Sequence, residues 1–273
     1  MYKAVPTEES CAKAWVAACK ALIASCDEGY NIVIDVADPL AHSREDNMVI
    51  SLVDKFLKTH DSYPIITVAN TIFPQSLLDA HGPTHFYDVY HRDFASFSNT
   101  RQWGRYFERM TRHIDKGGTL TNPLQELITK LKGNEEKGTR LKAAYEIAAN
   151  PNDCDVSIDE KSPDAGDMTI YQPSRDRNRR IGGPCLSYLS FKRHSDDGLL
   201  LTAIYRNHYY IMRLLGNLIG LGRLQAFVAA QAGIPRGSLT VVSTHAELDA
   251  RPWGIAEARE LVSQSASILE SPV

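Results

Sequence analysis

The stretch PCLSYLSFKRHSDDGLLLTAIYRNHYYIMRLLGNLIGLG, residues Pro184–Gly222, decides the fold. Within it, Leu186–Arg193 and Leu199–Arg206 are runs rich in apolar, β-branched and aromatic residues, and the Asp-Gly pair between them is typical of a tight turn. The pattern predicts a β-hairpin. Apolar residues at helical spacing then run through Ile211–Gln231, so we expect a long helix after the hairpin.

The expected register of this hairpin brings a cysteine and an arginine together. With the turn centred between Asp196 and Asp197, Ser187 faces Arg206 on the opposite strand. Cys185 shares a face with Ser187, so Cys185 and Arg206 are expected to be diagonal neighbours, about 7–8 Å apart. A guanidinium beside a thiol favours the nucleophilic thiolate and can also hold a phosphate. A buried structural cysteine beside an unrelated surface arginine is the alternative interpretation.

Asn217 is a polar residue on an otherwise apolar face of the predicted helix. Gly233 suits the C-terminal cap of that helix, and Pro235 prevents the helix from continuing. A buried amide without partners costs roughly 1–3 kcal/mol, so we expect Asn217 to be hydrogen-bonded. Two interpretations stay open: a tether between the helix and a loop, or an amide that presents a donor and an acceptor to a base edge.

The other segments predict further helices and strands within one domain spanning residues 1–273. Thr7 is expected to cap a first helix, in which Cys11, Cys19 and Cys26 serve as small core residues. The patterns along the chain predict strands at Asn31–Val36, Tyr63–Ala69 and Leu239–Val242, helices at Met48–Leu57, Leu124–Leu131 and Thr139–Ala149, and an exposed loop at Asn150–Pro163.

The composition is ordinary for a globular protein and excludes several classes. The chain has 273 residues, of which 43% are hydrophobic, and 30 Lys and Arg against 33 Asp and Glu give a formal net charge of −3. Without a basic field, general nucleic-acid binding is not expected, and no segment predicts a membrane span. The five cysteines form no CxxC pair. We therefore expect neither a disulfide framework nor a metal site, and a reducing, cytoplasmic location.

Together these residues resemble the thymidylate synthase family, including the related pyrimidine nucleotide hydroxymethylases. The segments that carry the resemblance keep the family's order and spacing: Pro184-Cys185-Leu186, the hairpin, Tyr205-Arg206, Asn217 eleven residues later, and AQAGIPRGSLTVVSTHA at Ala230–Ala246 with His245. The resemblance covers roughly residues 170–245. A fainter match, WGRYFERM at Trp103–Met110, contains Tyr106.

The resemblance implies an α/β (α+β) fold with a bent, mostly antiparallel sheet flanked by helices, and a homodimer formed through sheet faces. It implies 5,10-methylenetetrahydrofolate as cofactor and no metal. Cys185 would add to C6 of a uracil nucleotide, making C5 a carbon nucleophile toward the one-carbon unit. Arg206 would hold the phosphate, and Asn217 would read O4 and N3–H of the base. His245 would contact the sugar, and Tyr106 would order water near the base.

The chain departs from the family's pattern at the phosphate site. The family places a pair of arginines, donated by the partner subunit, upstream of the nucleophile, but Ala165 and Gly166 stand there. Arg140, or Arg179 and Arg180, are candidate substitutes. The last two belong to the basic run RDRNRR, for which a solvated loop is the alternative interpretation.

Further positions differ from the family. Asn207 replaces the serine that follows the phosphate arginine, and it stays a candidate substrate ligand. Tyr209 stands in place of the aspartate that binds the pterin ring, and Glu247 in place of the tyrosine that partners the sugar-binding histidine. The family's catalytic glutamate aligns with Leu52, and Asp54 is the nearest carboxylate. The C-terminus, SILESPV, is unlike the tail with which the family closes over folate.

Three functions are therefore considered. The first is C5 methylation of a uracil nucleotide. The second is hydroxymethylation of a pyrimidine nucleotide, in which water takes the place of hydride. The third is a thymidylate-synthase-like fold that binds a nucleotide or assembles with a partner without turnover. The missing arginine pair, aspartate and glutamate favour the third function, whereas the presence of Cys185 favours the first two.

Overall fold

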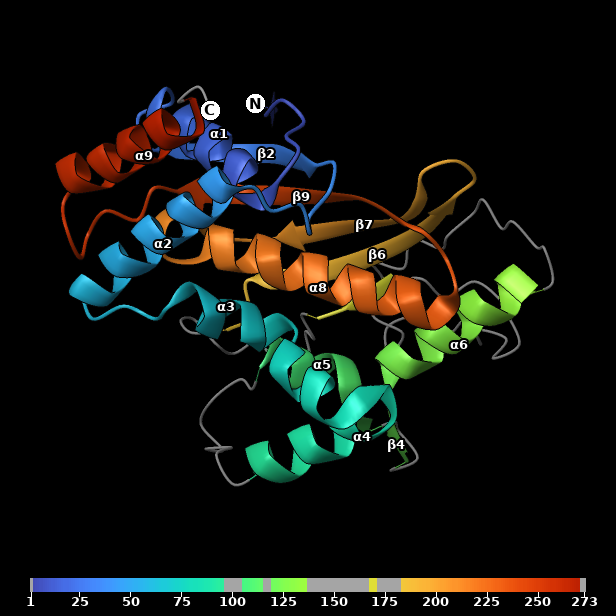
Figure 1. The fold of residues 1–273 in the computed structure, drawn as a ribbon. Coiled ribbons are helices and arrows are strands. Elements are labelled where there is room, and N and C mark those ends of the chain that lie inside the picture. Colours follow the sequence, from blue (N-terminus) through green and yellow to red (C-terminus); the bar gives the residue numbers. More distant parts are fainter. Residues whose placement is uncertain (1, 96–104, 115–118, 137–166, 171–182, 271–273) are drawn as a thin grey trace, which may run out of the picture.

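A mixed sheet forms the centre of the computed structural model, which describes residues 2–95, 105–114, 119–136, 167–170 and 183–270 (Figure 1). The strand order is β1-β2-β9-β7-β6-β5, and β8 pairs with β9 off this path. Antiparallel pairs are β2·β9, β7·β6 and β6·β5, whereas β1·β2, β9·β7 and β8·β9 are parallel. The strands are β1 (Lys3–Ala4), β2 (Glu28–Val36), β5 (Asp167–Thr169), β6 (Leu186–His194), β7 (Gly198–Tyr205), β8 (His208–Tyr209) and β9 (Arg236–Glu247).

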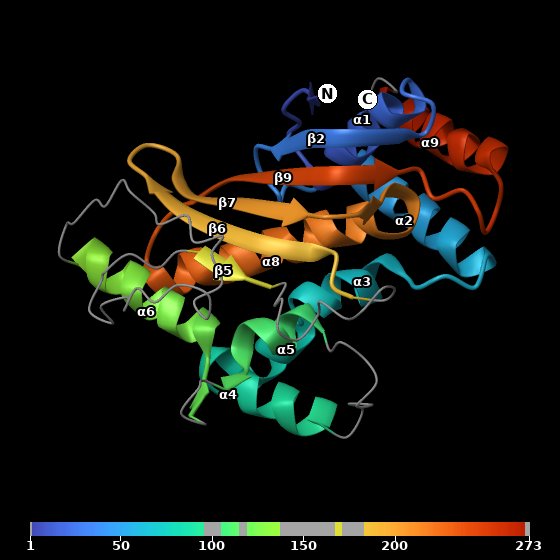
Figure 2. The same ribbon diagram turned by 180° about the vertical axis from the view of Figure 1, so that it is seen from behind.

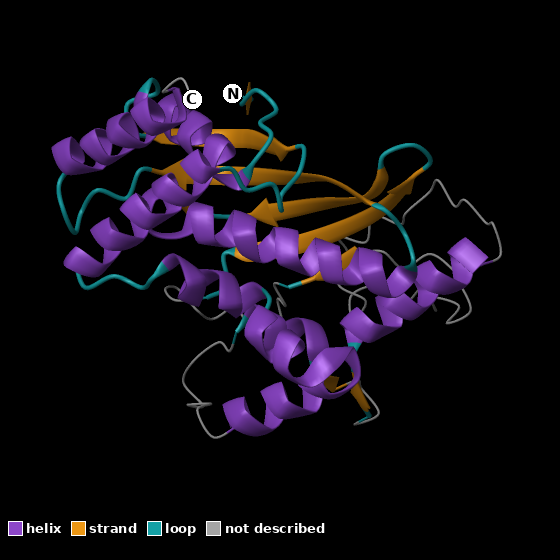
Figure 3. Cartoon of the chain, viewed as in Figure 1, coloured by secondary structure: helices purple, strands orange, loops and turns teal. Residues whose placement is uncertain are grey.

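Helices cover one face of this sheet, with α8 lying along it (Figures 1 and 3). No described helix lies over the opposite face, which Figure 2 shows from behind. The helices are α1 (Cys11–Ile23), α2 (Arg44–Thr59), α3 (Ile65–Ile72), α4 (Gln75–Ala95), α5 (Tyr106–Thr111), α6 (Pro123–Glu136), η1 (Tyr210–Leu214), α8 (Leu215–Ala232) and α9 (Ile255–Glu270); a small hairpin of β3 (His113–Ile114) and β4 (Leu120–Thr121) completes the elements. None of the helices in the described ranges could cross a membrane.

This architecture confirms the predicted α+β class, with a sheet whose described pairs are half parallel. The predictions for strand β2, helices α2 and α6, the hairpin β6–β7, helix α8 and strand β9 are confirmed. The thymidylate-synthase-like fold and the single domain of residues 1–273 stay predictions. The predicted helix at Thr139–Ala149 and loop at Asn150–Pro163 lie outside the described residues.

The first helix begins later than the sequence suggested. Ser10, not Thr7, is the N-cap of α1, and its side chain accepts a hydrogen bond from the amide of Lys13 at 3.3 Å. Cys11 and Cys19 are buried core residues, as predicted. The prediction for Cys26 was wrong, because Cys26 is exposed in a turn with φ of 61°.

The predicted strand at Tyr63–Ala69 was wrong, because these residues enter helix α3. β-Branched residues favour strands, but their propensity yields to tertiary packing. The carboxylate of Asp54 accepts a hydrogen bond from the first amide of α3 at 3.0 Å. On α8, a Cβ at Gly216 would lie 2.7 Å from Cβ of Val68, so the two helices approach closely. This close helix packing stabilises α3 against a strand.

The loop of the β6–β7 hairpin differs from the predicted turn by one residue. His194 pairs with Gly198, so the connection is a three-residue loop rather than a two-residue turn. Gly198, the first residue of β7, has a φ of 81°, a left-handed conformation that glycine adopts without strain. The turn is therefore centred on Asp196.

The shifted turn also changes the register near Cys185. The predicted pairing of Ser187 with Arg206 was wrong, because Leu186 pairs with Tyr205 after an irregularity in β6. The amide of Arg206 then donates to the carbonyl of Cys185 at 2.9 Å. Cys185 and Arg206 are thus directly opposed rather than diagonal, which places them closer together than expected.

Candidate functional site

Cys185 lies at the start of β6, next to the phenol of Tyr106 from α5. The Oη atom of Tyr106 accepts hydrogen bonds from the amides of Cys185, at 3.1 Å, and Leu186, at 3.3 Å. Tyr106 is buried, and burial raises its pKa to about 12, so the phenol stays protonated. Two residues that are distant in the sequence are thereby fixed beside each other.

Arg206 follows β7 and lies across from Cys185. Its side chain is exposed, and its Nη2 atom is 2.6 Å from the position that a Cβ on Gly183 would occupy. The guanidinium therefore lies close over the backbone that precedes Cys185, where the absence of a side chain on Gly183 leaves room for it. A cationic donor in this position can hold an anionic group near Cys185.

The electrostatics of Cys185 differ from the expectation. Burial raises the pKa of the Cys185 thiol, and the charges of Arg206 and Arg213 oppose this effect. Arg206 acts in the predicted direction, but desolvation is larger. Arg213 comes from η1, where its Cζ atom lies 5.3 Å from the ring centroid of Tyr63. Two guanidinium groups, rather than one, favour the thiolate.

Asn217 is buried on α8 and hydrogen-bonded, as expected for a buried amide. Its Nδ2 atom lies 2.9 Å from Nε2 of His208, and Nδ1 of His208 lies 3.0 Å from Oγ of Ser243. The hydroxyl of Tyr210 donates to the same Oγ at 3.3 Å. Burial lowers the pKa of His208 to about 3, so its ring is neutral and has one N–H. The network restrains the amide, and its amide oxygen makes no bond within it.

Tyr205 connects Cys185 to this network. It ends β7, where it pairs with Leu186, and its ring stacks on that of His208 with centroids 4.0 Å apart and planes at 9°. The residues around Cys185 and those around Asn217 therefore share one neighbour, Tyr205. The structure brings the predicted Cys185, Arg206 and Tyr106 together, and it connects Asn217 to them through two aromatic rings.

His245 lies on β9 in a separate polar cluster. Its Nδ1 contacts Oδ1 of Asn207, and its Nε2 lies 2.9 Å from Oε1 of Glu28. The ring of Tyr30 packs against His245, with centroids 5.1 Å apart. Both ring nitrogens of His245 are thus engaged, so a sugar hydroxyl would have to displace Glu28 or Asn207.

Tyr209 and Glu247 occupy adjacent strands. The ladder between β8 and β9 pairs them directly, and both are half-buried. The Glu247 carboxylate lies 3.7 Å from Nη2 of Arg251. Nearby, the carboxylate of Asp249 accepts hydrogen bonds from the amides of Ile211 and Met212, at 2.8 and 3.0 Å, and so caps the start of η1.

Of the remaining candidates, only Asp54 and Leu52 belong to the part of the chain that the structure describes, and neither joins this cluster. Arg140, Arg179 and Arg180 lie outside the described residues. Asp54 has a structural role, since it binds the first amide of α3 and lies 2.5 Å from Nζ of Lys58. Leu52 is partly buried against the core. Within the described ranges, no group of three or more His, Cys, Asp or Glu residues could hold a metal ion.

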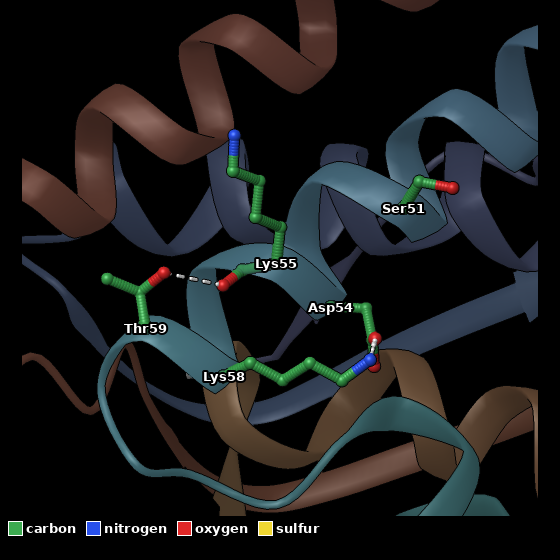
Figure 4. A pocket seen from close by; sticks show the side chains of 5 residues that line it. All are labelled: Ser51, Asp54, Lys55, Lys58 and Thr59. Atoms are coloured by element: carbon green, nitrogen blue, oxygen red, sulfur yellow. Dashed lines mark hydrogen bonds and ion pairs between the residues drawn. The ribbon is translucent and has the colours of Figure 1, made fainter.

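An open hollow of about 530 Å³ lies elsewhere, on helix α2 (Figure 4). Its lining includes the Lys58–Asp54 ion pair, and Thr59 donates to the carbonyl of Lys55 at 3.0 Å. Every residue that lines it belongs to this one helix: Ser51, Asp54, Lys55, Lys58 and Thr59. None of the predicted site residues lines the hollow.

Sequence reasoning missed Tyr205, His208 and Arg213. Arg213 precedes Asn217 by four residues on a helical segment, and this spacing was a usable signal because it places both side chains on one side. Tyr205 and His208 had no comparable signal, since their contacts depend on the irregularity in β6 and on the short strand β8.

The comparisons with known proteins are limited in extent. No protein-family model matches the chain. A protein of Methanopyrus kandleri named "Putative thymidylate synthase" is 36% identical over 78 residues, which are 29% of this chain and 37% of that protein. A protein of Methanococcoides burtonii with the same name is 33% identical over 70 residues, 26% of this chain and 32% of that protein. The matches span about a third of these relatives' lengths. They support a distant thymidylate-synthase-like relationship.

Proposed function

We propose that the chain transfers a one-carbon unit to C5 of a uracil nucleotide, as a methyltransferase. The observation that carries this proposal is the placement of Cys185 between Tyr106 and Arg206, with Asn217 linked to the same cluster. The distant thymidylate-synthase-like relationship supports the same class of reaction.

The nucleophile is the thiolate of Cys185. A bond forms between its sulfur and C6, and the electron pair of the C5–C6 double bond moves toward the C4 carbonyl, which makes C5 nucleophilic. Because burial raises the pKa of Cys185, the thiolate depends on the charges of Arg206 and Arg213. Arg206 also holds the 5′-phosphate, which brings the base over Cys185.

Asn217 selects the base. A carboxamide presents an N–H donor to O4 and an oxygen acceptor to N3–H of uracil. Since the contact with His208 restrains the amide of Asn217, the order of donor and acceptor is set before the substrate binds. Cytosine carries an amino group at C4 and no proton on N3, so the same order disfavours it.

Tyr209, the residue at the predicted folate position, lies next to a carboxylate that can bind a pterin. The aspartate of the family is absent, but Glu247 pairs directly with Tyr209, so a carboxylate and a phenol lie side by side on β8 and β9. A carboxylate accepts the N–H groups of a pterin, and a phenol can pack against its ring. When bound, 5,10-methylenetetrahydrofolate would supply the one-carbon unit and the hydride.

We also propose a homodimer formed through the uncovered sheet face. A row of four half-exposed residues crosses four adjacent strands, each residue paired with the next: Val33 of β2, Val242 of β9, Ile204 of β7 and Tyr188 of β6. An apolar row of this kind across an uncovered face favours association with a second copy.

A nucleotide-binding protein without turnover is the second candidate. The raised pKa of Cys185 favours it, because a protonated thiol is a poor nucleophile.

Release of tritium from C5-labelled uridylate and deoxyuridylate in the presence of methylenetetrahydrofolate tests the proposal. We expect release by the wild type and none by Cys185→Ser. The matched control is Cys26→Ser, which changes an exposed cysteine and should leave release unchanged. Nucleotide binding without release in the wild type would favour the second candidate. A rise in dihydrofolate absorbance would distinguish methylation from hydroxymethylation.

A further inference from the structure

Tyr205 has a buried hydroxyl without a hydrogen-bond partner. Its side chain is fully buried at the end of β7, and its Oη has no hydrogen-bond partner among the described residues. Buried polar groups in folded proteins are nearly always paired, because an unpaired donor has lost its bonds to water. Tyr87 also has a buried, unpaired phenol, so this feature alone does not point to a ligand, and the position of the Tyr205 hydroxyl decides what it can bind.

The position of this hydroxyl relates it to the nucleophile. Tyr205 pairs with Leu186, whose amide, together with that of Cys185, donates to the Oη of Tyr106. Burial is the main cause of the raised pKa of Tyr205, and the phenol of Tyr106 and the thiol of Cys185 raise it further. On its other side, the Tyr205 ring stacks on His208.

The chemistry of the group is that of a donor. The raised pKa keeps the proton on the phenol, so Oη–H can donate to a neutral oxygen but does not act as a base near neutral pH. Its near neighbours are the Cys185 thiol and a phenol that already accepts two backbone hydrogen bonds. Because Oη has almost no exposed surface in the free protein, a carbonyl oxygen of a pyrimidine ring over Cys185 reaches it only if the side chains around Tyr205 shift.

We propose that the hydroxyl of Tyr205 donates a hydrogen bond to a ring carbonyl oxygen of the pyrimidine substrate. This inference rests on the proposed function and adds a ligand-contacting residue to it. The phenol becomes paired only when the nucleotide is bound, so its hydrogen bond contributes to affinity and not to the stability of the free protein.

The test compares Tyr205→Phe with Tyr87→Phe. Both changes remove only a buried phenol oxygen without a partner, and the rings remain in their stacked positions. Tyr87 lies in α4, and burial alone accounts for its raised pKa, without a contribution from Cys185. Neither variant should lose thermal stability as free protein, because no hydrogen bond is broken.

Deoxyuridylate binding, measured by calorimetry, separates the two variants. We expect Tyr205→Phe to bind about threefold to tenfold more weakly than wild type, and Tyr87→Phe to bind like wild type. The 2-thio and 4-thio analogues, whose sulfur accepts more weakly, extend the test. Wild type should discriminate against one of them, and Tyr205→Phe should lose that discrimination.

The outcomes separate this inference from the proposed function. If the wild type binds no uracil nucleotide, the proposed function fails. If the wild type binds deoxyuridylate and Tyr205→Phe binds it equally well, the proposed function stands and the role of Tyr205 is refuted. A loss of stability in the free Tyr205→Phe protein would also refute it, because the hydroxyl would then have an internal partner.

Discussion

The Nδ2 atom of Asn217 lies 2.9 Å from the Nε2 atom of His208, whose ring is buried and neutral. An amide nitrogen can only donate, so Nε2 is the accepting nitrogen and Nδ1 carries the proton toward Ser243. The tautomer of one histidine therefore fixes which way the amide of Asn217 points.

Replacing Asn217 by aspartate should shift the base preference from uracil toward cytosine. Asp has no N–H to donate to O4, whereas its carboxylate accepts from the amino group of cytosine. We expect the ratio of kcat/KM for deoxyuridylate over deoxycytidylate to fall at least tenfold in Asn217→Asp. Asn47→Asp, which changes an exposed amide on α2, is the control. An unchanged ratio would show that Asn217 does not read the base.

Arg206→Ala should weaken the binding of uridine monophosphate by about 10- to 150-fold, as expected for loss of a charged hydrogen bond, with little effect on uridine. Gly183→Ala provides a second variant that keeps the charge. Its Cβ would lie 2.6 Å from Nη2, so the guanidinium must move aside. We expect an intermediate loss for the monophosphate. Equal losses for nucleotide and nucleoside, measured by calorimetry, would contradict the phosphate role.

Stability should fall as the pH rises from about 4 to 7 because of Asp249. Burial raises the pKa of this carboxyl from 3.8 to about 7, so the folded state keeps a proton that the unfolded chain has released. The contribution of the Asp249 proton to the free energy of unfolding is complete below pH 3.8 and is lost by about pH 7. Between these values the free energy of unfolding falls by up to about 1.4 kcal/mol per pH unit.

Urea unfolding between pH 4 and 8 measures this slope. Asp249→Asn should flatten the profile, because the amide does not titrate. Asp79→Asn, at an exposed carboxylate paired with Gln75, should keep the wild-type slope. A wild-type slope in Asp249→Asn would assign the pH dependence to other groups.

Gly216→Ala should destabilise the protein by about 1–3 kcal/mol, because a methyl group there overlaps Val68 and the carbonyl of Ile65. Gly133→Ala is the matched control on α6, where nothing lies within 4 Å of the added Cβ. That change should be neutral or slightly stabilising, since alanine favours a helix over glycine. Equal unfolding midpoints for the two variants would mean that α3 and α8 do not pack this closely.

Ile204→Glu should shift the protein from dimer to monomer in sedimentation experiments. A charge in the centre of the apolar row would be desolvated in a sheet-to-sheet interface. Lys55→Glu, at an exposed residue of helix α2 on the helix-covered side of the sheet, is a charge-changing control that should leave the dimer intact. A monomeric wild type would refute the proposed homodimer.

Local patterns predicted the elements whose signals agree with their final environment. The Asp-Gly turn between apolar runs indicated the hairpin, and the helical spacing before Gly233 indicated α8 with its left-handed cap. The prediction for residues 65–69 was wrong, because their β-branched side chains favour a strand. The helix there is favoured by long-range contacts, chiefly the close approach of α8 at Gly216 and Gly220.

Only the part of the candidate site that depends on local pairing could be predicted from the sequence. Cys185 and Arg206 are joined by a hairpin, so their proximity followed from local pairing, although Arg206 lies opposite Cys185 rather than Ser187, two residues from the predicted register. The approach of Tyr106 and the stacking of Tyr205 on His208 are long-range contacts. No periodicity in the chain encodes such contacts, so they required the three-dimensional structure.

The glycines of α8 have a consequence for ligand selectivity. Gly216 and Gly220 allow α8 to lie in backbone contact with α3, and Asn217 stands between these two points of closest approach. Rotation or sliding of the helix there would create steric overlap, so the amide is preorganised. A nucleotide that docks against Asn217 therefore loses little affinity to ordering entropy, and discrimination between bases is expected to appear mainly as a difference in enthalpy.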